Sequence, residues 1–213
     1  AVSDVLRKFR ETTPLVHCIT NYVAMNFSAN VLLAAGGSPA MIHAPEETSD
    51  FARIANALTI NIGTLSPPWV EGMKKAIAAA SDEDVPWVFD PVGHFATPYR
   101  ATVAQDILKM GPTILRGNAS EIMALDGQSS DAKGVDATDP VEAAEAAALS
   151  LATAHKSVVV ITGEIDFVTD GSRIARVKGG SELMTQITAM GCSLTCLMGG
   201  FAAVAPAMVA AVT

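Results

Sequence analysis

Charged residues are scarce in this chain: they make up 17% of its 213 residues, whereas 50% are apolar. The mean hydropathy is +0.34, so ample apolar surface is available to offset the entropy cost of ordering the chain. Basic residues are fewest, with 14 Lys and Arg against 22 Asp and Glu and a net charge of −8. Such a balance excludes the electrostatic footprint of a nucleic-acid or anionic-membrane binder. We expect a folded protein without a nucleic-acid partner.

Cysteine is also rare. There are three, Cys18, Cys192 and Cys196, an odd number in a chain too long to need disulfide staples. This favours reduced thiols in a reducing compartment and predicts a cytoplasmic protein. The first thirteen residues carry five charged side chains, and a secretory signal peptide would need an uninterrupted apolar stretch there. No signal peptide is therefore expected.

One stretch lacks charge altogether, from Leu183 to Thr213. An apolar run of that length is normally interpreted as a membrane span. Here several polar residues dilute it, Pro206 interrupts it, and no basic residue flanks its far side as an interfacial anchor. We predict buried protein core and subunit contact, with no membrane role.

Apolar runs of strand length alternate with amphipathic segments through most of the chain. The predicted strands span residues 15–19, 40–42, 58–62, 87–89, 113–115 and 158–161, and the helices 22–35, 45–56, 67–80, 98–110, 119–125 and 140–155. Strands without polar alternation, each followed by a helix, indicate an α/β fold with a parallel sheet covered on both faces. The polar segment 126–139 is predicted to be a surface loop rather than a domain boundary, because the alternation of strands and helices resumes beyond it.

The pattern changes after residue 162. Apolar runs at 167–169 and 173–177 flank Asp170-Gly171, a turn signal that predicts an antiparallel hairpin at the edge of the sheet. A strand-like run at 183–187 follows, then a helix rich in small residues at 191–205. Pro206 is predicted to begin a last helix.

The chain contains neither a phosphate-binding P-loop nor a dinucleotide-binding glycine fingerprint. In an open parallel sheet, ligands bind beyond the carboxyl ends of the strands. Four sites have polar residues there: Thr20-Asn21, Asn61 with Gly63, Asp90-Pro91-Val92-Gly93, and Arg116-Gly117-Asn118 with Glu121.

Two carboxylates and an arginine could converge at these ends. Asp90 and Glu121 are hard oxygen donors suited to Mg²⁺, and Arg116 can hold phosphate oxygens in its bidentate fork. A plainer interpretation also stands: Asp90 as a turn residue, Glu121 as an acid that complements a helix dipole, and Asn21 as a helix cap.

A second constellation is Ala189-Met190-Gly191-Cys192, where small residues open the predicted helix. Free backbone N–H groups at such a start bind anions. The Cys192 thiol is either a small core side chain or a group that faces the reacting atom, and Cys196, one turn later, favours the core. The four histidines show no metal-binding spacing, so no zinc site is predicted. Of the nine methionines, only Met41 stands at a strand end.

Together the motifs resemble those of the hydroxyethylthiazole kinase family, in order and over nearly the whole chain. The matching segments are 14–23, 38–41, 61–65, 90–93, 116–122, 162–164 and 191–192. The resemblance implies a ribokinase-like α/β fold and transfer of the γ-phosphoryl group of ATP to the hydroxyl of 4-methyl-5-(2-hydroxyethyl)thiazole, in thiamine biosynthesis or salvage. It also implies Mg²⁺ as cofactor and a homotrimer with active sites between subunits.

The resemblance further implies roles for single residues. Met41 and Asn21 would contact the thiazole, Arg116 and Thr162 would hold ATP, and Asp90 and Glu121 would hold the metal. Gly191 with Cys192 would form the helix start beside the reacting hydroxyl, with Cys192 as the catalytic residue.

The chain departs from the family at two places. Ala189, which would face the substrate, stands where the family commonly has glycine, so either the backbone stays at negative φ or the loop is reshaped. The chain also stops at Thr213, where family members usually continue; we therefore expect residues 1–213 to be a single kinase domain that lacks the family's C-terminal segment.

Two kinds of alternative remain open. The first is another ribokinase-like enzyme, such as a hydroxymethylpyrimidine kinase or a dehydratase of hydrated nicotinamide cofactors, which typically has aspartate where Cys192 stands. The second is a catalytically idle, trimeric ligand-binding protein that keeps the fold.

Overall fold

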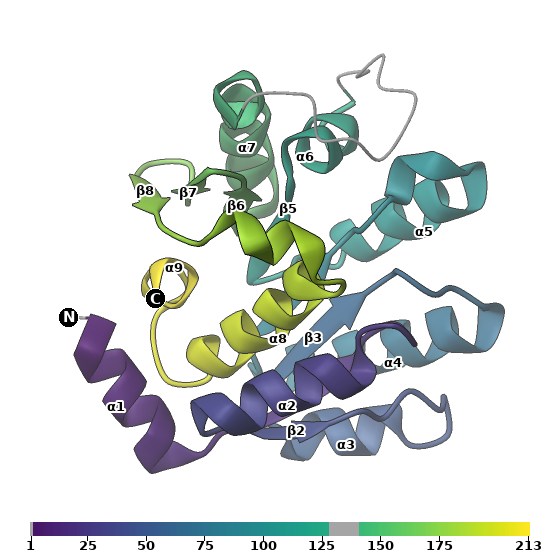
Figure 1. Ribbon diagram of the computed structural model, residues 1–213. Coiled ribbons are helices and arrows are strands. Elements are labelled where there is room, and N and C mark those ends of the chain that lie inside the picture. The colour runs from purple at the N-terminus through teal and green to yellow at the C-terminus, as the bar shows by residue number, and fades with distance from the viewer. Residues whose placement is uncertain (1, 128–140) are drawn as a thin grey trace.

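The computed structural model describes residues 2–127 and 141–213, and its strands form one sheet (Figure 1). The strand order is β2-β1-β3-β4-β5-β6-β7-β8. The strands are β1 Leu15–Ile19, β2 Ser38–Ala40, β3 Ala57–Asn61, β4 Trp87–Asp90, β5 Ile114–Asn118, β6 Val158–Thr162, β7 Ile165–Thr169 and β8 Ile174–Lys178. Strands β1 to β6 pair in parallel, and β7 and β8 add an antiparallel edge hairpin. The predicted mostly parallel sheet with an antiparallel edge is confirmed.

Helices cover both faces of this sheet. They are α1 Val2–Thr12, α2 Met25–Ala35, α3 Thr48–Ile54, α4 Pro67–Asp82, α5 Pro98–Leu108, α6 Ala119–Leu125, α7 Val141–His155, α8 Met190–Ala202 and α9 Ala207–Val212, with short 3₁₀ helices η1 His94–Ala96 and η2 Glu182–Gln186. One apolar cluster lies between the sheet and α3 to α7, and a second lies beneath α1, α2, α8 and α9. In Figure 1 the second group of helices lies on the near face, with α2 beside α8.

The strands explain why both faces are covered. Trp87 and Phe89 of β4 pack into the first cluster, whereas Val88 between them packs into the second. Successive side chains of a strand point to opposite faces, so a strand that is apolar at every position needs helices on both sides.

Local signals also set the helix starts. The Ser66 hydroxyl accepts the Trp69 N–H at 3.5 Å before α4, and Thr97 accepts the Arg100 N–H at 3.3 Å before α5. A proline follows each cap, at the position where its missing N–H costs nothing.

Residues 183–187 differ from the prediction of a strand. They lie largely in the 3₁₀ helix η2, where the Met184 N–H bonds the Ser181 carbonyl at 2.9 Å and the Ser181 hydroxyl accepts the Leu183 N–H at 3.3 Å. These local bonds replace pairing with a neighbouring strand. Leu183, Met184 and Ile187 are exposed on the single chain, so they are not part of its core, and the expected core burial applies to parts of α8 and α9. The expected subunit contact at these residues stays a prediction.

Two further expectations concern a membrane span and the surface loop at 126–139. Within the described residues, no helix is long and apolar enough to cross a membrane. The predicted surface loop at 126–139 lies mostly outside the described residues, as does Pro140 at the predicted start of α7.

Candidate active site

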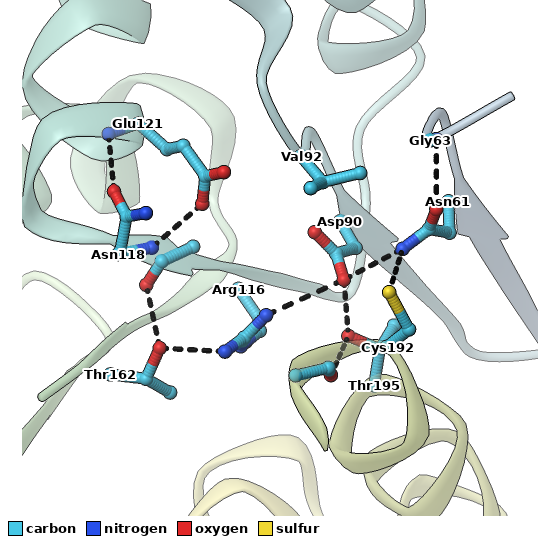
Figure 2. Close-up of polar contacts among 12 residues, drawn as sticks. Asn61, Gly63, Asp90, Val92, Arg116, Asn118, Glu121, Thr162, Cys192 and Thr195 are labelled. Atoms are coloured by element: carbon cyan, nitrogen blue, oxygen red, sulfur yellow. Dashed lines mark hydrogen bonds and ion pairs between the residues drawn. The ribbon is translucent and has the colours of Figure 1, made fainter. Parts of the chain in front are cut away.

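The carboxyl ends of the parallel strands and the start of α8 meet at one place (Figure 2). Strand register aligns Asn61 at the end of β3 with Asp90 at the end of β4, and Asn118 of β5 with Thr162 of β6. In Figure 2, Asp90 and Arg116 lie between Glu121 on one side and Cys192 on the other. The structure thus gathers the strand-end residues that the sequence singled out.

Asp90 is at the centre of this arrangement and is fully buried. Its Oδ2 accepts hydrogen bonds from Asn61 Nδ2 and Thr195 Oγ1, both at 2.9 Å, and pairs with the Arg116 guanidinium at 3.5 Å. Its Oδ1 is buried and has no hydrogen-bond partner among the described residues. Burial, and secondarily the charge of Glu121, raise the pKa of Asp90, while the charge of Arg116 opposes the shift.

Arg116 is held across the site. Its Nη2 donates to Thr162 Oγ1 at 2.7 Å, and its buried Nε has no partner among the described residues. A Cβ atom at Gly191 would lie 2.6 Å from Arg116 Nη1, so only glycine lets the start of α8 come this close to the guanidinium. The result is a fixed positive charge beside a helix start, which suits the binding of phosphate.

Glu121 helps to cap the start of α6 and also faces the site. Its Oε2 accepts the Asn118 N–H at 2.8 Å while Asn118 Oδ1 accepts the Glu121 N–H at 2.9 Å, a capping box at the start of α6. Its Oε1 accepts the Gly93 N–H at 2.9 Å. Each carboxylate oxygen keeps a second lone pair that these bonds leave unused. The plain helix-start interpretation is therefore right, and it leaves Glu121 able to bind a cation.

Cys192 lies in the first turn of α8. Its Sγ accepts hydrogen bonds from Asn21 Nδ2 and Asn61 Nδ2, each at 3.3 Å. Burial and the nearby charge of Asp90 outweigh these donors and raise the pKa of the thiol to about 11. The burial penalty and the charge of Asp90 together exceed what the two amide donors and the charge of Arg116 supply, so the neutral thiol is favoured.

Ala189 and Met41 are two further candidates for substrate contact. Ala189 caps α8 in the left-handed conformation, with φ 64° and ψ 10°. Of the two alternatives expected there, a backbone at negative φ is excluded. Met41 follows β2 and packs against the apolar cluster beneath α8 rather than joining the polar network.

The sequence predicts Asn21 both as a helix cap and as a site residue. Its Oδ1 accepts the Ala24 N–H at 3.1 Å, in the turn that leads into α2. The helix itself begins after Ala24 and has no side-chain cap, so the predicted cap is wrong for α2 and applies only to the turn before it. Asn21 Nδ2 donates to Cys192 and, at 2.8 Å, to Asn61 Oδ1, which brings the amide into the polar network.

Sequence reasoning missed two residues that hold the site together, Thr195 and Arg100, and it missed the capping role of Asn118. Thr195 bonds Asp90, and its spacing of three residues from Cys192 on α8 could have indicated this. The spacing of Asn118 and Glu121 is that of a capping box. Arg100 carried no signal, although it donates to the carbonyls of Gly93, Ile62, Val92 and Gly63 at 2.9, 2.7, 2.6 and 3.4 Å.

The chain is similar to known proteins in both sequence and structure. Residues 6–213 match the model of the hydroxyethylthiazole kinase family. A hydroxyethylthiazole kinase of Rhizobium etli (strain CIAT 652) is 60% identical over 202 residues, which cover 95% of this chain and 78% of that protein. The solved structure of a hydroxyethylthiazole kinase protein from Pyrococcus horikoshii OT3 is similar with a TM-score of 0.90 and 41% identity, over 98% of this chain and 79% of the other.

A more distant structure shows the fold alone. An ADP complex of Bacillus subtilis pyridoxal kinase aligns with a TM-score of 0.66 and 15% identity, over 93% of this chain and 87% of the other. The arrangement of sheet and helices is therefore the one that ribokinase-like proteins share.

Proposed function

Because this chain belongs to the hydroxyethylthiazole kinase family, we propose that its strand-end site transfers the γ-phosphoryl group of ATP to the hydroxyl of 4-methyl-5-(2-hydroxyethyl)thiazole. The product is a thiazole phosphate in thiamine biosynthesis or salvage. The observation that carries the site assignment is the convergence of Asp90, Arg116 and Cys192, from three separate elements, on the start of α8. The relatives favour this reaction over the pyrimidine kinase and dehydratase alternatives.

Arg116 and Thr162 are proposed to hold the phosphates of ATP. The guanidinium is pinned by Thr162 on one side and Asp90 on the other, so little side-chain freedom remains to be lost on binding. Beside it, the first-turn N–H groups of α8 have no acceptors within the helix and suit an anion. The transferring phosphoryl group would therefore lie beside both the Arg116 guanidinium and the start of α8.

Asp90 and Glu121 fit a magnesium ion. Among the described residues no group of three or more His, Cys, Asp or Glu forms a metal cage. Mg²⁺ does not need one, since it is usually bound by one or two carboxylates together with substrate phosphates and water. The unpartnered Oδ1 of Asp90 is an oxygen that lacks a hydrogen bond and is suited to a cation. When bound, the ion would neutralise charge on the phosphates.

Asn21, Met41, Ala189 and Gly191 are proposed to contact the thiazole alcohol, with Cys192 facing its hydroxyl. Phosphoryl transfer through a loose transition state needs little deprotonation of the attacking oxygen. A neutral thiol therefore suffices as a hydrogen-bonding partner that orients the hydroxyl, and the rate comes mainly from positioning and electrostatics.

We further propose a cytoplasmic homotrimer with active sites between subunits, each chain being a single kinase domain. Exposed apolar side chains are neighbours of site residues along the chain: Tyr22 and Val23 follow Asn21, and Leu183 and Ile187 precede Ala189. Exposed apolar surface, where it gathers in a patch, marks protein contacts. The three free cysteines fit a reducing compartment.

The test is incubation of the protein with ATP, Mg²⁺ and the thiazole alcohol, with ADP and thiazole phosphate measured by chromatography and mass spectrometry. Both products should appear in equal amounts. Binding of the alcohol without turnover would support the idle ligand-binding protein instead, and turnover of a hydroxymethylpyrimidine alone would support the sister kinase.

A matched pair of variants tests the assignment of the phosphate site. Arg116→Lys should lower kcat/KM for ATP by about tenfold or more, because an ammonium cannot make the planar two-point contact. Arg53→Lys, at an exposed ion pair with Glu83, is the control and should leave the kinetics unchanged. Equal behaviour of the two variants would refute the role of Arg116.

A further inference from the structure

Asn61, the last residue of β3, links the two halves of the site. Its side chain is buried, with 2% of the residue exposed. Its Oδ1 accepts the Gly63 N–H at 2.9 Å and Asn21 Nδ2 at 2.8 Å, while its Nδ2 donates to Asp90 Oδ2 at 2.9 Å and to Cys192 Sγ at 3.3 Å. All four hydrogen-bonding positions of the amide are therefore used.

These partners fix which way the amide points. The Gly63 N–H can only donate, so the atom of Asn61 that faces it must be the acceptor oxygen Oδ1. A flipped amide would place its NH2 group against that N–H, donor against donor. The Nδ2 atom must consequently face Asp90 and Cys192, as Figure 2 shows.

The loop after β3 is shaped around this contact. A Cβ atom at Gly63 would lie 2.5 Å from Asn21 Nδ2, so glycine leaves the space that the Asn21 amide occupies on its way to Asn61. Asn21 then adds a second N–H to the Cys192 sulfur at 3.3 Å. The two amides thus approach the sulfur as donors.

The direction of the thiol hydrogen follows. Neither amide nitrogen can accept a hydrogen bond, so the single S–H hydrogen of Cys192 points away from both. The sulfur is held by its lone pairs, and its hydrogen is left for another partner. That is the geometry a neutral thiol needs if it is to orient a substrate hydroxyl.

We propose that Asn61 is a positioning residue for phosphoryl transfer, which holds the Cys192 thiol and the Asp90 carboxylate in a fixed relation across the site. The inference rests on the proposed function and deepens it. Asn61 acts through Cys192 on the side of the alcohol and through Asp90 on the side of the phosphates. Loss of the Asn61 side chain should therefore lower the rate of phosphoryl transfer more than the affinity for ATP, which is assigned to Arg116 and Thr162.

The test compares Asn61→Asp and Asn61→Ala with a matched control, Asn56→Asp. Asn61→Asp keeps the size and the acceptor contacts but replaces both donors by an oxygen that faces Asp90 and Cys192. Asn56 lies at the other end of β3, is exposed, and accepts the Leu15 N–H at 2.8 Å, a bond that aspartate can also make. Three quantities are measured: the melting temperature, kcat with KM for each substrate, and the rate at which iodoacetamide alkylates Cys192.

Both Asn61 variants should melt cooperatively and lose kcat on the order of 100-fold, the cost of a misplaced reacting group. KM for ATP should change by less than about threefold. In Asn61→Asp the alkylation of Cys192 should slow, because the sulfur loses an N–H donor and gains a negative neighbour. Cys18 and Cys196 are buried, so mass spectrometry can assign the label. Asn56→Asp should match the unmodified protein in all three measurements.

Several outcomes would overturn the inference. A folded Asn61 variant whose kcat stays within about threefold of the unmodified protein would do so, as would a loss confined to KM for ATP. Failure of both variants to fold would assign Asn61 a structural role instead. An unmodified protein that does not phosphorylate the alcohol would contradict the proposed function, whereas the alkylation measurement would still report whether Asn61 controls the thiol.

Discussion

At the scale of single residues, Ala189 holds a strained backbone conformation at the start of α8, next to the site. Its left-handed backbone turns the chain into α8 just before Gly191 and Cys192. For a residue with a Cβ this conformation costs about 1–2 kcal/mol, and glycine escapes that cost. The alanine is kept in place because the surrounding chain specifies the turn.

Ala189→Gly should therefore stabilise the protein slightly. Relief of the strain exceeds the extra entropy of glycine in the unfolded chain, about 0.5–1 kcal/mol, so a rise in melting temperature of about 2 °C is expected. Ala203→Gly is the control, since Ala203 ends the same helix at φ −64° and should lose stability. Thermal unfolding of both variants decides the matter, and a lower melting temperature for Ala189→Gly would show that no strain is stored there.

Cys192 should contribute modestly to the rate. We expect Cys192→Ala to lower kcat by about tenfold, at the weak end of acid–base effects, and Cys192→Asp to remain active. Because the pKa of the thiol is raised to about 11, its proton stays bound below that pH and kcat should show no limb from Cys192 between about pH 6 and 9. Measurement of kcat over this range checks both statements. A loss beyond about a thousandfold in the folded alanine variant would reveal a catalytic base or nucleophile.

The sequence alone predicted which residues lie at the site but not all of their properties. Asp90 and Arg116 could be found because each stands at the end of an apolar run, and Glu121 because it lies one turn into the helix that follows Arg116; the carboxyl ends of parallel strands meet. The pKa of Cys192 could not, because burial and the charge of Asp90 act through space between β4 and α8. The position of Cys192 at a helix start would by itself suggest a lowered pKa.

At the scale of secondary-structure elements, two strand-end loops depend on one side chain of α5. Arg100 donates to the carbonyls of Ile62 and Gly63 after β3 and to those of Val92 and Gly93 after β4. The Gly93 N–H in turn reaches Glu121. The guanidinium thereby joins the loop that follows Asn61 to the loop that orients Glu121.

Arg100→Met should destabilise the fold by about 2–4 kcal/mol, because hydrogen bonds to a charged donor are lost and backbone carbonyls are left unpaired. The control is Arg53→Met, at exposed ion pairs of α3 with Asp82 and Glu83, where at most about 1 kcal/mol is expected. Urea unfolding gives both free energies. Equal losses would mean that Arg100 does not hold the two loops.

Prediction of the elements succeeded where one local pattern determined the structure. Strand β1 and helix α6 have the predicted bounds, since a mostly apolar run defines the strand and a capping box defines the start of the helix. It failed at 183–187, where a run of strand length that is mainly apolar pairs with no strand among the described residues and follows the capping residue Ser181. A periodicity of apolar residues cannot tell whether a partner strand exists.

At the scale of the whole molecule, the exposed apolar residues beside the site should be covered by other subunits. Sedimentation should give the mass of three chains, and Leu183→Glu should shift it toward one. Ile54→Glu is the control, because Ile54 is as exposed as Leu183, 66% against 65%, but lies at the end of α3, on the face of the sheet opposite to α8. A monomeric unmodified protein, or dissociation by both variants, would contradict the proposed location of the subunit contact.

Acid stability of the whole fold should depend on His17 in β1. Its ring is buried against Phe51, and its Nε2 contacts the Ile42 carbonyl at 2.8 Å. Burial lowers the pKa of His17 to about 4, while the bond to Ile42 opposes the shift. The unfolded chain, with a histidine pKa of about 6.5, therefore binds more protons than the native protein between the two values.

The sign of the pH dependence follows from that difference. Stability is complete above about pH 6.5 and falls as the pH drops toward about 4, by up to about 1.4 kcal/mol per pH unit from this one group. His17→Gln can still donate to Ile42 but cannot be protonated, so its free energy of unfolding should vary less steeply over this range. The pH dependence that remains in this variant would include a contribution from His94, because burial lowers the pKa of that histidine too. Urea unfolding at pH 7, 6, 5 and 4.5 measures the two slopes, and equal slopes would show that the protonation of His17 is not linked to unfolding.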